Sequence, residues 1–333
     1  MFSMILKIAL SVLLFFKSCE RSTSSASSTI PIEYEILWEP AGEINDRVYC
    51  LLNAGTNFFA GTYHGLYMSA DSGRTWTLTK NGLTITTIRA LAEKDGNIFA
   101  AGGILEGGIS ISHDLGKTWT DAKKGLPNTS VSSLAVSGKN IYAGTFAYGI
   151  FVSDDNGKQW RAMNRGLPST FGDVTALAAD GNTIVACINS DTSSIYKSSD
   201  GGLNWHDISR GLPPDHADFT SILIRGHDFL ISADGDSGGI FSLAKGEADW
   251  KRLNLNDRSV SVLAESGPVL FAGGFGGLQA STDHGSSWFA ADNGLYPQGL
   301  PDVNAVMIFS DRILAGLNFG GVYTLIPPKV LLQ

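Results

Sequence analysis

Carboxylates and aromatic rings recur at regular positions along this chain, and such side chains bind or hydrolyse sugars and bind peptides. The most regular carboxylates belong to the pattern Ser-x-Asp-x-Gly-x-x-Trp. Its five intact copies are SADSGRTW (69–76), SHDLGKTW (112–119), SDDNGKQW (153–160), SSDGGLNW (198–205) and STDHGSSW (281–288). A sixth copy, SLAKGEADW (242–250), is one residue longer and lacks the Asp.

The residue types in this pattern are those of a tight turn between two strands. An Asp side chain accepts hydrogen bonds from the backbone of its own turn, and Gly permits a positive φ. The Trp is expected to open the next strand and to fill space against a neighbouring unit. We therefore predict a structural role, rather than a catalytic or metal-binding one, for Asp71, Asp114, Asp155, Asp200 and Asp283.

Tryptophan marks a repeat that extends over most of the chain. The seven tryptophans are separated by 38, 43, 41, 45, 45 and 38 residues, and four short strands with their turns need about 40 residues. Three apolar segments precede each turn, as in VSSLAVSG (131–138), NIYAGTF (140–146) and GIFVS (149–153). We predict an all-β chain forming a single seven-bladed β-propeller of four-stranded blades, with strand a innermost and strand d outermost.

Each end of the repeat region holds an incomplete blade. The last segment supplies strands a, b and c in VNAVMIF (303–309), RILAGLN (312–318) and GVYTLI (321–326), without a Trp. The segment IEYEILWEP (32–40) supplies one strand around Trp38. We expect this N-terminal strand to complete the last blade and to close the ring, so that the propeller spans residues 32–333. An outermost strand tolerates Pro40.

The Ser-x-Asp-x-Gly-x-x-Trp copies resemble the BNR/Asp-box repeat of sialidases, sortilin-type receptors, xyloglucan-active glycoside hydrolases and the photosystem II assembly factor family. A Gly-Leu signature after the repeat is similar to that of the assembly-factor-like group. It occurs here as NGL (81–83 and 293–295), KGLP (124–127) and RGLP (165–168 and 210–213). The resemblance covers about residues 32–326 and implies the propeller fold, which hosts both hydrolases and binding proteins.

The resemblance also implies what an enzyme of this type would need. Sialidases use three arginines around the substrate carboxylate, and only Arg47, Arg89 and Arg258 lie near the starts of strands a. No set matches the sialidase residues, so sialidase activity is not expected. A paired-carboxylate glycoside hydrolase stays open as an alternative. Its candidate pairs are Asp191 with Asp234 and Asp173 with Asp218.

A ligand is expected on one face of the ring. In propellers the loops from strand d to a and from b to c open on one face, called here the loop face, and the Ser-x-Asp turns lie on the other. Aromatic platforms with carboxylates suit sugars, cationic peptides or a basic segment of a partner. The candidate ligand-binding residues are Tyr63, His64, Phe146, Tyr148, Asp173, Asp191, Asp218, Asp234, Asp236, Phe275, Asp302 and Phe319.

The N-terminus has the features of an export signal. Lys7 precedes the apolar run IALSVLLFF (8–16), which is too short to span a bilayer and fits a signal peptide over residues 1–18. Ser18-Cys19 resembles a bacterial lipobox, so we expect a lipid anchor on Cys19; an ordinary signal peptide cut nearby is the alternative. Residues 19–31 are rich in Ser and Thr and predict a flexible tether.

Charge and motif content narrow the function. The formal charge of −8 disfavours nucleic acid as a partner. No cofactor or metal is expected, because neither a phosphate-binding Gly-rich loop nor a cluster with metal-ligand spacing occurs. The leading hypothesis is a non-catalytic cell-envelope scaffold that binds a protein or glycan through the loop face and meets the membrane only through its lipid anchor. The alternatives are an exported glycoside hydrolase and an assembly factor for a membrane protein complex.

Overall fold

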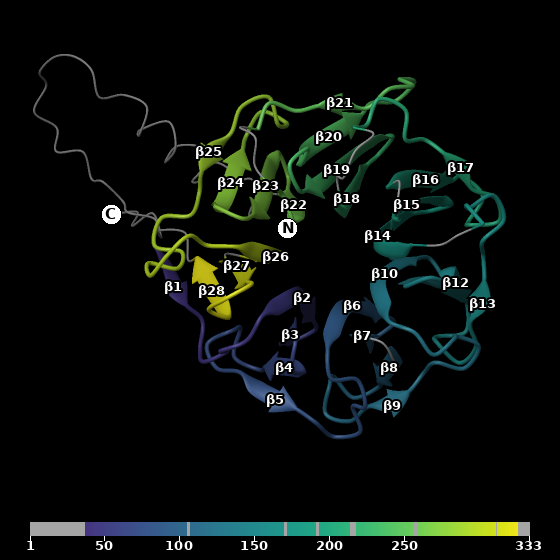
Figure 1. Ribbon diagram of the computed structural model, residues 1–333. Coiled ribbons are helices and arrows are strands. Elements are labelled where there is room, and N and C mark those ends of the chain that lie inside the picture. Colours follow the sequence, from purple (N-terminus) through teal and green to yellow (C-terminus); the bar gives the residue numbers. More distant parts are fainter. Residues whose placement is uncertain are drawn as a thin grey trace, which may run out of the picture.

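The chain forms a ring of seven four-stranded antiparallel sheets (Figure 1). The computed structural model describes residues 37–104, 107–169, 172–190, 193–213, 218–255, 259–310 and 312–325. The predicted seven-bladed β-propeller is thereby confirmed. The predicted signal peptide, Cys19 and the tether lie outside the described residues.

Each blade contributes one strand to each of four concentric positions. The innermost strands a are β2 (Val48–Ala54), β6 (Ile88–Lys94), β10 (Val131–Ser137), β14 (Asp173–Asp180), β18 (Asp218–Arg225), β22 (Val262–Ser266) and β26 (Val303–Phe309). Strands b are β3 (Asn57–Thr62), β7 (Asn97–Gly103), β11 (Asn140–Thr145), β15 (Thr183–Asn189), β19 (Asp228–Asp234), β23 (Val269–Gly274) and β27 (Arg312–Leu317). Strands c are β4 (Leu66–Ser69), β8 (Gly107–Ser112), β12 (Gly149–Ser153), β16 (Ser194–Ser198), β20 (Gly239–Leu243), β24 (Gly277–Ser281) and β28 (Val322–Leu325). The outermost strands d are β5 (Thr77–Thr79), β9 (Thr120–Asp121), β13 (Arg161–Ala162), β17 (His206–Asp207), β21 (Lys251–Arg252), β25 (Phe289–Ala290) and β1 (Trp38–Pro40).

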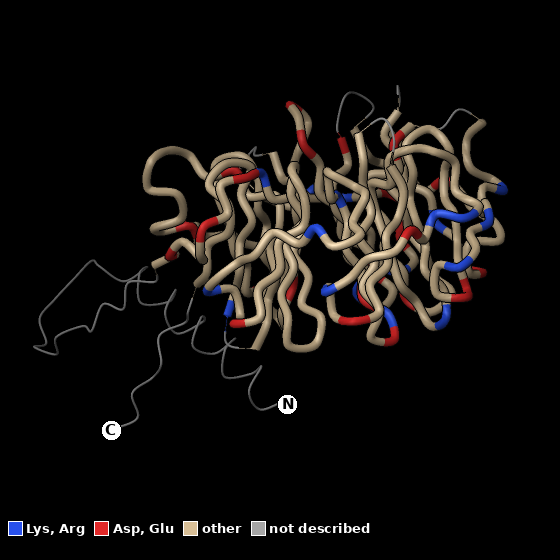
Figure 2. The backbone as a smooth tube through the Cα atoms, turned by 90° about the horizontal axis from the view of Figure 1, so that it is seen from below, with Lys and Arg blue, Asp and Glu red and all other residues tan. Residues whose placement is uncertain are grey.

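The order of the strands separates two faces of the disc, which Figure 2 shows edge-on. Because neighbouring strands are antiparallel, the d–a and b–c connections lie on one face and the a–b and c–d turns on the other. All strands a therefore begin at the loop face, around the central channel (Figure 1). This arrangement gathers side chains from seven blades at one end of the channel.

The hydrophobic core lies between the blades. Strand β3 is buried along its whole length, and Phe59 packs with Ile98 and Trp119 of the next blade. Small residues in strand b allow this close approach, because a Cβ on Gly144 would lie 2.6 Å from Cγ1 of Val174 in the following blade. The ring is thus a set of blade-to-blade layers, each built by two neighbouring sheets.

The glycine-containing turn after strand d forms a backbone hydrogen bond to the Trp of the following blade. The backbone N–H of Trp160 donates a 2.9 Å hydrogen bond to the carbonyl oxygen of Lys124. Gly125 has φ +92°, and a Cβ there would lie 2.2 Å from the carbonyl oxygen of Trp160. The equivalent bonds join Trp38 to Asn293, Trp119 to Asn81, Trp205 to Arg165 and Trp250 to Arg210. The Gly-Leu signature therefore marks the position where two blades touch through their backbones.

Strand d starts later than predicted in most blades. We expected the Trp to open that strand, but in six blades strand d begins one residue after the Trp. In four of these blades the Trp backbone N–H is bonded to the preceding blade and is not available to strand c. In these four blades the Trp therefore connects two blades through its backbone and lies outside strand d, whereas Trp38 makes the equivalent bond and also pairs with Leu325.

The N-terminal strand completes the last blade, as predicted. Strand β1 pairs with β28, with Trp38 opposite Leu325 and Pro40 opposite Tyr323 (Figure 1). The Trp38 indole N–H donates a 2.8 Å bond to the carbonyl of Ala291 in the preceding blade, and the side chain is buried. The ring is thus closed by hydrogen bonds between the two ends of the propeller.

The Ser-x-Asp turns are held by the carboxylates inside them. Oδ1 of Asp71 accepts bonds from the Ser69 hydroxyl at 2.8 Å and the Thr75 backbone N–H at 2.9 Å, while Oδ2 accepts one from the Thr75 hydroxyl at 2.7 Å. The Gly73 N–H donates to the Ser69 hydroxyl oxygen at 2.8 Å. A positive φ of +86° makes glycine the fitting residue at this position.

These hydrogen bonds predict an acid-dependent contribution to stability. Bonds from Thr75 lower the pKa of Asp71 from its ordinary 3.8 to about 2, and equivalent bonds lower the pKa values of Asp114 and Asp200 to about 2. A carboxylate whose pKa falls on folding stabilises above its unfolded pKa, and this stabilisation is lost as the pH falls towards the folded pKa. The melting temperature is therefore expected to fall between about pH 4 and pH 2.

The triple variant Asp71→Asn, Asp114→Asn, Asp200→Asn isolates this effect. It should melt below the wild type at pH 5, and the gap should narrow as the pH is lowered to 2, because the wild-type carboxyls become protonated as well. Melting curves of both proteins over this range make the comparison. A gap that stays constant would show that charge on these carboxylates does not stabilise the fold.

Candidate binding site at the mouth of the central channel

An extra residue near the start of strand a is the feature that builds the site. In six blades the pairing of strands a and b shifts near the start of strand a, which is a β-bulge. The shift lies between the first and third residues of the strand in four blades and between the second and fourth in β14 and β18. A bulged residue is left out of the ladder, and its side chain is re-aimed. The bulged residues are Tyr49, Arg89, Ser132, Thr175, Thr220 and Asn304, and Ser261 holds the equivalent place before β22.

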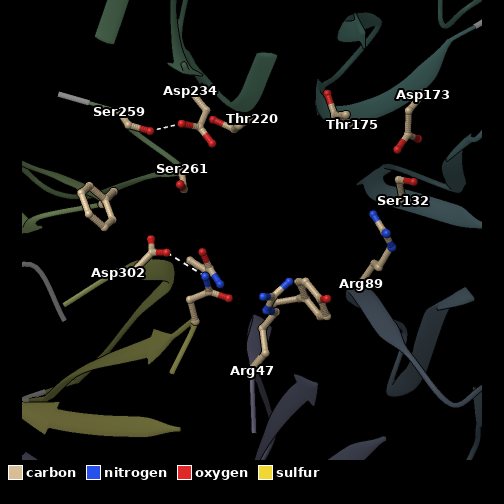
Figure 3. Close-up of a pocket in the computed structure, with 14 residues that line it drawn as sticks. Arg47, Arg89, Ser132, Asp173, Thr175, Thr220, Asp234, Ser259, Ser261 and Asp302 are labelled. Atoms are coloured by element: carbon tan, nitrogen blue, oxygen red, sulfur yellow. Dashed lines mark hydrogen bonds between the residues drawn. The ribbon is translucent and has the colours of Figure 1, made fainter. Parts of the chain in front are cut away.

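All seven of these residues line one cavity at the loop-face end of the channel, called here the mouth cavity. It has a volume of about 650 Å³. The residues just before strands a and just after strands b complete its wall, and these are Arg47, Asp173, Asp234, Ser259, Phe275, Asp302 and Asn318. The wall carries two arginines and three aspartates, a formal charge of −1. Figure 3 shows side chains from all around the ring pointing into this space.

Three of the bulged side chains link one blade to the next. The Thr175 hydroxyl donates a 2.6 Å bond to the carbonyl of Phe219, and the Thr220 hydroxyl donates a 2.8 Å bond to that of Val260. The Asn304 amide donates to the Val48 carbonyl across the ring closure, at 3.2 Å. The side chains of Thr175, Thr220 and Asn304 therefore form hydrogen bonds that connect neighbouring blades.

Two of the three carboxylates in the mouth cavity are held by neighbours. Asp234 accepts a hydrogen bond from the Ser259 hydroxyl and one of 2.7 Å from the Gly235 backbone N–H. Asp302 accepts a 2.8 Å bond from the side-chain amide of Asn318 (Figure 3). Both carboxylates are thus partly satisfied within the protein.

The two arginines flank one aromatic ring. The guanidinium carbons of Arg47 and Arg89 lie 5.9 and 5.8 Å from the ring centre of Tyr49, within cation–π range. Arg47 also lies 5.8 Å from the ring centre of Phe319. Within the described ranges, no ion pair involves either guanidinium.

The third carboxylate of the mouth cavity, that of Asp173, has a raised pKa. Burial raises its pKa above the ordinary 3.8, and the Ser132 hydroxyl and the positive charge of Arg89 act in the opposite direction. Three other buried polar atoms of the cavity residues, Nε of Arg89, Oδ1 of Asp173 and Oδ1 of Asn318, have no hydrogen-bond partner among the described residues. Such atoms are rare in folded proteins, and each calls for an explanation.

A second groove adjoins the mouth cavity between the first and last blades. It has a volume of about 700 Å³ and shares Arg47 and Asn318 with the mouth cavity. Tyr63, Tyr296 and Phe319 contribute aromatic surface to it. The two hollows are therefore neighbours on the loop face, with Arg47 and Asn318 between them.

The predicted site residues are distributed over three places. Asp173, Asp234, Phe275 and Asp302 line the mouth cavity, and Tyr63 and Phe319 line the adjoining groove. The other described candidates are exposed and line neither hollow: His64, Phe146, Tyr148 and Asp236 in the connections between strands, and Asp218 at the start of β18. Asp191 lies outside the described residues. Of the two carboxylate pairs considered for hydrolysis, Asp173 and Asp218 are not brought into the same cavity.

Sequence reasoning missed most of the bulged residues. Arg89 was noted only for its place near a strand start, and Tyr49, Ser132, Thr175 and Asn304 were not singled out. A usable signal exists, because near the start of each strand a a Val, Ile or Phe is followed by a polar or aromatic residue, as in Val48-Tyr49 and Ile88-Arg89. Ordinary strand alternation would make the second side chain of such a pair face a neighbouring blade.

No protein-family model and no curated protein matches this chain. Solved structures do match, and they share the fold. A family 74 xyloglucanase from Xanthomonas campestris has a TM-score of 0.68 at 16% identity, over 87% of this chain and 53% of that one. The extracellular domain of a putative one component system from B. thetaiotaomicron has a TM-score of 0.70 at 14% identity, over 87% and 40%. YCF48 bound to D1 peptide has a TM-score of 0.67 at 16% identity, over 89% and 99%.

These likenesses establish the propeller and leave the activity open. The chain spans about half the length of the xyloglucanase and 40% of the extracellular domain, but nearly the whole of YCF48. The described residues include no helix long and apolar enough to cross a membrane. They also include no group of three or more potential metal ligands.

Proposed function

We propose that this chain is a non-catalytic scaffold of the cell envelope that binds a protein or a glycan through its loop face. The observation that carries the proposal is the mouth cavity, where bulges in strand a turn one side chain from every blade into a shared space. A cavity of this size with converging polar groups is typical of ligand sites. The rigid ring holds these groups in place without a ligand.

Exposed aromatic rings surround this cavity and support the same conclusion. The exposed fractions are 41% for Tyr63, 53% for Phe146, 50% for Tyr148, 61% for Phe275 and 63% for Phe319. Rings of this size are normally buried, and a group of them on one face indicates an interaction surface. Such rings stack on sugars and pack against peptide side chains.

The likenesses to known proteins support binding and export. One similar structure is YCF48 bound to D1 peptide, and another is the extracellular domain of a putative one component system. The proposed signal peptide over residues 1–18, the lipid anchor at Cys19 and the tether over residues 19–31 would hold the ring outside the cytoplasm. Within this proposal, an assembly factor for a membrane complex is a scaffold whose partner is a membrane protein.

The double variant Phe146→Ala, Tyr148→Ala tests the loop face. Both side chains are half exposed, and the loop is held by backbone bonds such as Phe146 N–H to the Ser130 carbonyl at 3.0 Å. We therefore expect the melting temperature to change little and partner capture from native membranes to be lost. Pull-downs with cross-linking compare the full chain, the double variant and Cys19→Ala.

The double variant tests whether the loop face binds the partner, and Cys19→Ala tests the lipid anchor. Capture that survives in the double variant would show that the loop face is not the binding surface. A Cys19→Ala protein that stays in the membrane fraction would contradict the lipid anchor.

A glycoside hydrolase is the second candidate, because Asp173 and Asp234 line the same cavity and burial raises the pKa of Asp173. A carboxyl with a raised pKa can act as a general acid beside an ionised partner. Release of reducing ends from a glycan, lost on Asp173→Asn, would establish this activity. Binding without turnover would support the scaffold.

A further inference from the structure

Three neighbouring blades each contribute one polar side chain to the same part of the mouth cavity. These are Arg89, Ser132 and Asp173; the Ser132 hydroxyl and the charge of Arg89 both act on the Asp173 carboxylate, and Nε of Arg89 and Oδ1 of Asp173 have no hydrogen-bond partner among the described residues. In Figure 3 the Arg89 guanidinium and the Asp173 carboxylate point toward Ser132 from opposite sides. Elsewhere around the ring, Thr175, Thr220 and Asn304 bond to the next blade, and Asp234 and Asp302 have hydroxyl or amide partners.

The three groups together require a partner that both donates and accepts hydrogen bonds. A guanidinium only donates, an ionised carboxylate only accepts, and a Ser hydroxyl does either. A carboxylate ligand would offer nothing to Asp173 and would be repelled by it. An ammonium group would have no acceptor for Arg89. A hydroxyl group accepts two hydrogen bonds and donates one, which matches Arg89, Ser132 and Asp173 together.

We propose that Arg89, Ser132 and Asp173 form a subsite for a hydroxyl group of a neutral sugar residue. The proposal rests on the proposed function and names its ligand class. The sugar hydroxyl accepts hydrogen bonds from Arg89 and Ser132 and donates one to Asp173. It thereby bridges three polar side chains that converge in the mouth cavity (Figure 3).

The surroundings of the subsite fit a neutral sugar better than a charged ligand. The wall of the mouth cavity has a formal charge of −1, which attracts neither a polyanion nor a strongly cationic segment. Phe146 forms an isolated β-bridge with Asp173, so the backbones of these two residues are adjacent, and the exposed ring of Phe275 lines the same cavity. Aromatic rings next to paired donors and acceptors are the features that bind sugar rings.

Calorimetric titration of the full mature chain with defined oligosaccharides tests this subsite. The probes are neutral cello-, manno-, xylogluco- and chito-oligosaccharides, with oligogalacturonides as the acidic set. We expect at least one neutral set to bind and the acidic set to bind more weakly. Asp173→Asn and Ser132→Ala should each weaken neutral-sugar binding about tenfold or more.

Stability measurements separate this role from a structural one. Asp173→Asn removes a buried charge that lacks a full set of partners, so its melting temperature should equal or exceed that of the wild type. The matched control is Asp218→Asn, because Asp218 occupies the same place in the next blade but is exposed and lies outside the mouth cavity. Its affinity for the sugar should equal that of the wild type.

Several results would overturn the subsite. These are binding of the acidic set alone, neutral-sugar affinity unchanged in Asp173→Asn, or no binding by any neutral set. If no neutral sugar binds but the double variant Phe146→Ala, Tyr148→Ala loses capture of a protein partner, the sugar subsite is wrong and the binding function of the loop face is supported. If partner capture also survives that double variant, the proposed function falls with it.

Discussion

A chain that begins at residue 45 is expected to melt about 10 °C or more below a chain that begins at residue 37. The shorter chain lacks β1, so β28 becomes an unpaired outer strand. It also loses the buried Trp38 side chain and its 2.8 Å bond to the Ala291 carbonyl. Loss of a buried Trp costs about 3–5 kcal/mol, and the exposed strand edges add to this loss.

The chain that begins at residue 37 is the matched control, because it lacks the same upstream segment but keeps β1. Thermal melting followed by circular dichroism compares the two proteins at equal concentration. The point variant Trp38→Ala in the full mature chain should show most of the same loss. Equal melting of the two truncated chains would mean that the ring is stable without its closing strand.

Gly125→Ala is expected to destabilise the propeller by at least about 2 kcal/mol. A Cβ at this position would lie 2.2 Å from the Trp160 carbonyl oxygen and 2.4 Å from the Gln159 amide nitrogen. The φ of +92° adds backbone strain for any residue with a Cβ. Relief of these contacts requires that the turn holding Gly125 move away from the Trp160 backbone, whose N–H is bonded to Lys124.

Gly138→Ala in the same blade is the control for backbone strain alone. Gly138 also has a positive φ, of +56°, but a Cβ there would meet nothing within 4 Å. Its replacement should cost about 1 kcal/mol. Urea unfolding of the two variants and the wild type measures the difference. Equal losses at both positions would show that the blade-to-blade contact at Gly125 contributes nothing beyond φ.

The regular part of the fold was predictable because its causes are local. Each Ser-x-Asp turn closes through hydrogen bonds within a few residues, as at Ser69 and Asp71. Such a turn is therefore visible in a short stretch of sequence. The period of the tryptophans then predicts the number of blades, and the lone strand at Trp38 predicts the closure. These inferences need no knowledge of how blades meet.

The binding site was only partly predictable because the side chains that build it depend on register. Asp173, Asp234, Phe275 and Asp302 were identified from their place in loops, and they line the mouth cavity. Tyr49 and Ser132 follow strand-like residues, and alternation alone assigns them to the faces of a sheet. One extra residue in strand a reverses that assignment, and only the pairing with strand b reveals the extra residue.

By itself, the sequence determined the architecture of this protein: seven blades, their turns, the closing strand and the face on which loops gather. It did so because turns and strand periods are encoded within about ten residues. The tertiary structure alone decided which side chains share the mouth cavity. It also decided that Thr175 and Asn304 bond to neighbouring blades while Arg89 and Asp173 each keep a polar atom without a hydrogen-bond partner among the described residues. The physical reason is that these outcomes depend on the bulges and on contacts between blades some 40 residues apart, which no local pattern contains.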